Sequence, residues 1–157
     1  MSKPLKNISF VCVPMTGKTI EEIRPGDQAE IAKTISESDV YLYAGITGDF
    51  NPIHINQIYA EKTFFKSRIA HGFLSAGLIS AIIAKSLPGP GTIYLKQKLN
   101  FMAPVYIGDT ITASVEVLKT DIPNNRVMLK TICKNHKNKV VIEGQALVSP
   151  PKRLKSD

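Results

Sequence analysis

The sequence predicts a single-domain α+β protein in which most strands follow a group of helices. Its 157 residues match the size of one domain, and neither a repeat nor a low-complexity linker divides them. Helical spacing dominates residues 36–85, whereas residues 92–149 alternate between apolar and polar positions. Because helices and strands are segregated along the chain, the pattern favours α+β.

The first part of the chain is expected to hold a leader, a turn and one strand. Residues 1–17 contain two lysines and the short apolar run ISFVCVPM, which Pro14 interrupts and which has no small-residue cleavage site. We therefore expect a loosely held leader rather than a signal peptide, and a cytoplasmic protein. The segment IRPGDQ (residues 23–28) predicts a turn, and AEIAKTI (residues 29–35) alternates like a strand.

Two helices are predicted next. Ser36 followed by Asp39 resembles a capping box, the apolar positions after it recur at helical spacing, and Gly48 is suited to end that helix. Asn56 can cap a second, shorter helix.

A third helix is expected to be buried on all sides. From Phe73 to Ala84 almost every residue is apolar or small, and the Pro88-Gly89 pair ends the run. Three to four strands follow, separated by the turns DIPNN and NHKN. One sheet wrapped around this helix would explain why the helix has no polar face, although the pattern does not give the order of the strands.

Composition argues against several classes of partner. The net charge of +7 makes a polyanionic partner conceivable, but the lysines are dispersed and no nucleic-acid motif is present. The densest basic stretch is the tail PPKRLKSD (residues 150–157), which we expect to fray. The longest apolar run has 16 residues, fewer than the ~20 that a membrane span needs. Cys12 and Cys133 lack metal-ligand spacing, so we expect no metal site and no disulfide framework.

The segment GDFNPIHIN (residues 48–56) concentrates candidate catalytic groups. Asp49 follows a predicted helix C-terminus, where the helix dipole favours the protonated carboxyl and suits a proton donor. Pro52 fixes the chain between Asp49 and His54, so both side chains could point at one place. Gly-Asp and Asn-Pro are also ordinary turn signals, and His54 could simply be packed between two isoleucines. Spacing alone leaves both interpretations open.

Gly72 is the second candidate, at the predicted start of the apolar helix. A helix N-terminus presents unpaired N–H groups, and glycine lets a ligand approach the backbone closely. Together these features suit a carbonyl oxygen that gains negative charge. A glycine packed against another helix would look the same in the sequence.

Three segments together resemble the (R)-specific enoyl-CoA hydratases, the MaoC-like group of hot-dog folds. Residues 43–60 hold the pattern D-x-N-P-x-H, residues 68–83 hold an H-G helix start, and residues 91–117 hold a G-D-x-[IV] strand entry. The resemblance covers roughly residues 18–149. It departs at Asn56-Gln57, where the family often has Asp-Pro, and we expect little effect of this change on the chemistry.

This resemblance implies a hot-dog fold over residues 18–149, with an antiparallel sheet wrapped around a long helix at residues 72–85, and at least a homodimer. It also implies reversible addition of water to a trans-2-enoyl-CoA, which gives an (R)-3-hydroxyacyl-CoA. Coenzyme A is part of that substrate, and no separate cofactor is expected. By analogy Asp49 and His54 would hold one water, with His54 favoured as base and Asp49 as acid, and the Gly72 N–H would bind the thioester oxygen.

Four further residues are assigned to substrate binding. Asn51 could brace the catalytic loop through its side chain. By the resemblance, Ser80, Ile83 and Leu147 would border the acyl-chain pocket. Plain core packing stays an alternative for Ile83 and Leu147, whereas a buried Ser80 hydroxyl would need a partner.

Three other functions stay open at this point. A hot-dog acyl-CoA thioesterase would share the helix N-terminus, but most lack the Asp49/His54 pair joined through N-P-x. A non-catalytic acyl-CoA-binding module would not need both side chains. A dehydratase that works on carrier-protein substrates would share the chemistry and differ only in the carrier.

Overall fold

A computed structural model describes residues 16–153, and most of the expected leader and the end of the basic tail lie outside this range. Its centre is a five-stranded antiparallel sheet with the order β1-β3-β4-β5-β2. The strands are β1 (Gln28–Thr34), β2 (Ile93–Phe101), β3 (Thr110–Asp121), β4 (Arg126–Asn135) and β5 (Val140–Ser149).

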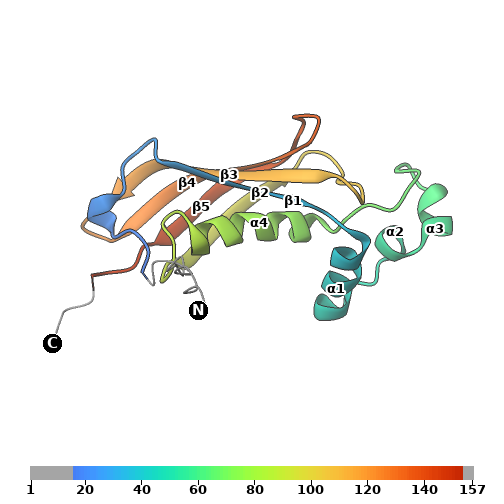
Figure 1. The fold of residues 1–157 in the computed structure, drawn as a ribbon, viewed down its shortest axis with the longest axis horizontal. Helices are drawn as coiled ribbons and strands as arrows, with labels where there is room; N and C mark the ends of the chain where they lie inside the picture. Colours follow the sequence, from blue (N-terminus) through green and yellow to red (C-terminus); the bar gives the residue numbers. More distant parts are fainter. Residues whose placement is uncertain (1–15, 154–157) are drawn as a thin grey trace, which may run out of the picture.

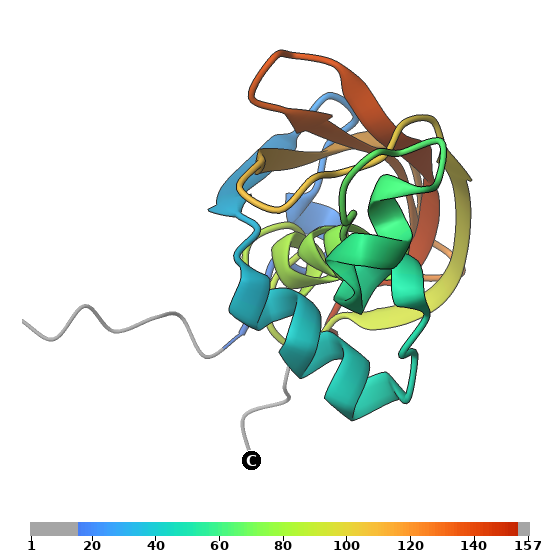
Figure 2. The same cartoon turned by 90° about the vertical axis from the view of Figure 1, so that its right-hand side faces the viewer.

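The helix α4 (Gly72–Lys85) runs along one face of this sheet, and the sheet curls around it (Figures 1 and 2). The sheet contributes the alternate residues Ile111, Ala113, Val115 and Val117 of β3, all at most 1% exposed. The helix contributes Ile79, Ile82 and Ile83 to the same core. This arrangement confirms the expected α+β class and hot-dog fold.

The prediction that α4 is buried on all sides is wrong for the single chain. Ser75, Ile79, Ile82 and Ile83 are buried, but the sheet covers only part of the helix circumference. The exposed positions are Gly72, Phe73, Gly77, Ser80, Ala81, Ala84 and Lys85. Except for Lys85 at the C-terminal end, this side of α4 is therefore apolar or small yet open to solvent.

Four short elements complete the fold. They are the 3-10 helix η1 (Ile20–Glu22) and the helices α1 (Glu37–Thr47), α2 (Pro52–Ile55) and α3 (Gln57–Glu61). The helices α1, α2 and α3 gather at one end of the sheet, by the N-terminus of α4 (Figure 1).

The predicted caps are present. Ser36 Oγ accepts a bond from the Asp39 N–H at 3.2 Å, while Asp39 Oδ2 accepts one from the Ser36 N–H at 2.8 Å. Gly48 ends α1 in the left-handed conformation, with φ of 76°. Asn56 caps α3 through a bond from the Tyr59 N–H at 2.9 Å.

The end of the predicted leader belongs to the fold. The N–H groups of Gly17 and Lys18 each donate, at 2.8 Å, to carbonyl oxygens of Pro90 and Pro88 in the loop after α4. A Cβ at Gly17 would lie 2.6 Å from the Pro88 oxygen, so only glycine fits without movement. Within residues 16–153, no helix combines the length and apolar character that a membrane span needs.

Candidate active site

The fold brings Asp49, His54 and the start of α4 to one place. Asp49 lies in the turn after α1, and His54 lies on α2, a four-residue helix where the sequence predicted only a turn. Asn51 starts α2 by accepting a bond from the Ile53 N–H at 3.3 Å, and Pro52 occupies its first turn. This cap and proline turn the His54 side chain inward, where it is 8% exposed.

Asp49 and His54 are separated by about the span of one water. A carboxylate oxygen of Asp49 and a ring nitrogen of His54 lie within 4.8 Å of each other. A water that bonds to both at ~2.8 Å would fit between them. The Asp49 side chain is 49% exposed, so this water can exchange with solvent.

The hydrogen bond of His54 determines which ring nitrogen carries the proton. Nδ1 lies 2.7 Å from the Ile69 carbonyl oxygen, which can only accept, so Nδ1 donates and Nε2 holds the lone pair. Burial lowers the pKa of His54 below 6.5, and the neighbouring His71 lowers it further. The bond to Ile69 and the Asp49 carboxylate act in the opposite direction and do not outweigh burial. His54 is therefore neutral at pH 7, with Nε2 free to take a proton.

His71 contacts both catalytic candidates, Asp49 and His54. Its ring is 2% exposed, and its Nε2–H donates to the Asp49 carbonyl oxygen at 2.9 Å. The same ring lies 3.9 Å, between centroids, from the ring of His54. The sequence does not indicate this role, because the contact joins positions 22 residues apart.

The same three side chains include atoms that metals prefer. Potential ligand atoms of Asp49, His54 and His71 lie within 4.8 Å of one another. The bond to the Asp49 carbonyl oxygen places a proton on His71 Nε2, so His71 could offer a metal only the lone pair of its buried Nδ1. The expectation of no metal stays a prediction.

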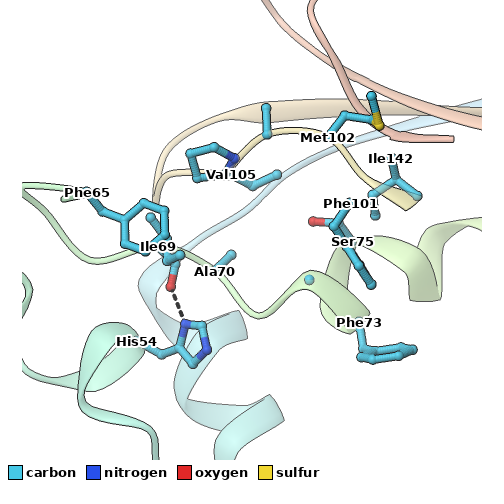
Figure 3. A pocket seen from close by; sticks show the side chains of 13 residues that line it. His54, Phe65, Ile69, Ala70, Phe73, Ser75, Phe101, Met102, Val105 and Ile142 are labelled. Atoms are coloured by element: carbon cyan, nitrogen blue, oxygen red, sulfur yellow. Dashed lines mark hydrogen bonds between the residues drawn. The ribbon is translucent and has the colours of Figure 1, made fainter. Parts of the chain in front are cut away.

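A pocket of about 440 Å³ opens beside His54, within the usual range for ligand sites (Figure 3). Its wall is mainly apolar and combines the strand-like segment before α4, the first turn of α4 and the end of β2. The lining residues are His54, Phe65, Ile69, Ala70, Gly72, Phe73, Ser75, Phe101, Met102, Ala103, Pro104, Val105 and Ile142.

Gly72 lies at the first position of α4 and lines this pocket. A Cβ there would lie 2.6 Å from Cε1 of Phe101, so glycine allows the aromatic ring to approach the helix start. Other lining residues, such as Phe65 and Met102, do not belong to the predicted motifs, and no local pattern in the sequence marks them as part of a site. The folding of the chain brings them to the pocket.

The structure does not bring Ser80, Ile83 and Leu147 together at this pocket. Ser80 is exposed on the open side of α4, so the expectation of a buried hydroxyl is wrong in the single chain. Ile83 is buried in the core. Leu147 alternates with the buried Ala146 and Val148 and therefore lies on the other face of the sheet. Their role at the acyl chain stays a prediction.

Comparison with known proteins agrees with this geometry. Residues 21–142 match the model of the MaoC-like domain family. The chain is 54% identical over 133 residues to an (R)-specific enoyl-CoA hydratase of Rhodospirillum rubrum, covering 85% of this chain and 92% of the relative. It is 45% identical to a 3-hydroxybutyryl-CoA dehydratase of Methylorubrum extorquens, covering 87% of each.

Solved structures give the same result. An unliganded R-hydratase of Pseudomonas aeruginosa superposes with a TM-score of 0.83 at 45% identity, covering 88% of this chain and 89% of that one. An (R)-hydratase of Aeromonas caviae, involved in PHA biosynthesis, gives 0.81 at 34% identity, covering 83% of this chain and 99% of that one. By sequence and by fold, the chain belongs to the MaoC-like domain family.

Proposed function

We propose that this protein is an (R)-specific enoyl-CoA hydratase, a hydro-lyase that adds water reversibly to trans-2-enoyl-CoA. The observation that carries the proposal is the Asp49/His54 pair, about one water apart, beside an apolar pocket lined by Gly72. The names of the relatives described above support the reaction class and the coenzyme A thioester as substrate.

In the proposed reaction, His54 Nε2 takes a proton from the bound water as the hydroxyl oxygen forms a bond to C3. The π electrons of the double bond move through C2 towards the thioester oxygen, which the Gly72 N–H would stabilise. Asp49, which must enter this step protonated, gives a proton to C2 and then regains one from the imidazolium, which returns His54 to its neutral form. One such backbone donor is typically worth ~3 kcal/mol to the transition state. Because hydration involves only proton transfer and addition, we propose that it needs no metal or redox cofactor.

We further propose that the protein works as a homodimer. β2 is an edge strand, and its outer edge has no strand partner among residues 16–153. Ile93 and Leu95 of β2 are exposed, as is the apolar open side of α4. A second copy placed against this edge would cover both surfaces.

A cytoplasmic location is part of the proposal, and the free thiol of buried Cys133 is in keeping with a reducing compartment.

The test is hydration of crotonyl-CoA by the purified protein, followed by loss of the conjugated enoyl absorbance. The product would be offered to stereospecific 3-hydroxyacyl-CoA dehydrogenases. We expect rapid loss of absorbance and an (R) alcohol. An (S) product would contradict the stereochemistry, and release of free coenzyme A without hydration would favour a thioesterase instead.

A further inference from the structure

We propose that the Ser75 hydroxyl is a second hydrogen-bond donor to the thioester oxygen, beside the Gly72 N–H. This inference deepens the proposed function and rests on it. It adds a side-chain donor, from inside the pocket, to the backbone donor that the helix N-terminus provides.

Ser75 is a buried polar group without a partner. It is fully buried, and its Oγ makes no hydrogen bond within residues 16–153. Most buried side-chain hydroxyls are paired, and an unpaired one destabilises the folded state. Four buried side-chain atoms in the described range share this condition, but only Ser75 belongs to a residue that lines the pocket. A substrate atom would supply the missing partner.

The position of Ser75 on α4 directs its hydroxyl towards the expected oxyanion site. Ser75 lies three residues after Gly72, almost one turn along the helix, and helical side chains lean towards the N-terminus. Figure 3 shows its oxygen directed into the pocket, on the side where Ala70 and Val105 lie. The hydroxyl and the free amide of the first turn therefore face the same region.

Other uses of this hydroxyl fit less well. A nucleophilic serine needs a base within hydrogen-bond reach, and no such partner contacts Ser75 Oγ. The Cys133 thiol donates to the backbone oxygen of Ser75 at 3.8 Å, which leaves the side chain free. Its pocket neighbours include the apolar Val105 and Ile142, and an acyl chain offers no acceptor. The thioester oxygen is the substrate acceptor that must already reach Gly72.

The test compares Ser75→Ala with wild type against two non-reactive ligands that differ only at the carbonyl. Butyryl-CoA carries the thioester oxygen, whereas S-butyl-CoA, a thioether, lacks it. We expect Ser75→Ala to raise the Kd for butyryl-CoA about 3–10-fold, the value of one neutral hydrogen bond. The Kd for S-butyl-CoA should stay within about twofold. The kcat for crotonyl-CoA should fall at least ~10-fold, because the oxygen gains charge in the transition state.

Stability provides an independent readout, because alanine removes the unpaired hydroxyl. Without ligand, Ser75→Ala should raise Tm by about 2–4 °C, the opposite of what loss of a structural hydrogen bond would do. The matched control is Ser86→Ala at the exposed end of the same helix, which should leave both Kd values and kcat at wild-type levels.

Each contrary outcome has a separate meaning. An unchanged Kd for butyryl-CoA with unchanged kcat would overturn the role of Ser75 and leave the proposed function in place. Equal weakening of both ligands would also overturn it, since the effect would then be one of packing. If wild-type protein bound neither ligand and did not hydrate crotonyl-CoA, the proposed function itself would fail, and this inference with it.

Discussion

At the level of single residues, the hydrogen bond between His54 and Ile69 determines what the site can do. It fixes Nδ1 as the donor and leaves the Nε2 lone pair as the acceptor. A positioned base of this kind typically contributes 10²–10⁴-fold to a rate. The side chain of Asp49 has no comparable burial and meets solvent directly.

We expect Asp49→Asn and His54→Ala each to lower turnover of crotonyl-CoA at least ~100-fold, because each removes one acid–base group. Asn51→Ala offers a graded comparison, since it removes only the cap that positions α2. Circular dichroism and Tm should show that the catalytic variants stay folded. A folded Asp49→Asn or His54→Ala variant with near-wild-type turnover would refute the mechanism.

The lowered pKa of His54 predicts the direction of the pH dependence. Burial, assisted by His71, favours the neutral ring, so the base stays active below its ordinary value of 6.5. On its acidic side, the kcat/KM profile should therefore fall at a pH below 6.5. His136→Ala, at the exposed histidine, should leave this acidic limb in place. A limb centred above 6.5 would contradict the assignment.

The lowered pKa of His54 also affects the free energy of unfolding, which should fall as pH falls. Between pH 6.5 and the lower pKa of the folded state, the unfolded chain binds more protons at His54 than the native protein does. This contribution to the free energy of unfolding is therefore present above pH 6.5 and is lost as pH falls through the folded-state pKa.

At the level of elements, the N-terminus of α4 depends on close contact with the end of β2. The added Cβ of Gly72→Ala would meet the Phe101 ring at 2.6 Å, and this half-exposed ring can move aside. We expect the displaced ring to disturb the oxyanion site and lower kcat/KM at least ~10-fold, with little change in Tm. Steady-state kinetics and thermal melts would measure both.

Gly45→Ala in α1 is the matched control for that change. A Cβ at Gly45 meets no heavy atom within 4 Å, and alanine favours a helix by up to ~1 kcal/mol over glycine. This variant should keep full activity and gain stability. If Gly72→Ala behaved in the same way, the close approach at the helix start would have no catalytic importance.

Local sequence predicted the elements better than their environment. Capping by Ser36, termination at Gly48 and the alternating face of β3 are local patterns, and the structure confirms them. Burial of α4 was overestimated, because an apolar helix can also be open on one side in a single chain. The sequence singles out Asp49 and His54 as a pair, and the family resemblance adds Gly72 to the same site. It could not reveal His71 or Ser75, because their importance arises from contacts between distant segments and from a missing partner.

At the level of the whole molecule, the edge strand β2 predicts assembly. We expect light scattering to give about twice the 17.2 kDa mass of one chain. Leu95→Asp should lower that mass towards one chain, because it places a charge at the proposed interface. Leu118→Asp is the control, since Leu118 has a similar exposure of 41% but lies on β3. Dissociation by both variants, or by neither, would contradict an interface at β2.

The position of Gly17, beside the loop after α4, also determines where a fusion partner or a solid support can be joined to the protein. Thr16–Thr19 and Pro151–Arg153 line one shared pocket, so both ends of the described chain lie together. They lie at the far end of α4 from Gly72, and 14 residues of helix span about 20 Å. An attachment made at residue 16 or residue 153 would therefore lie about 20 Å from the start of α4 at the pocket. The adjacency of these two positions also makes the fold suitable for circular permutation through a short linker that joins them directly.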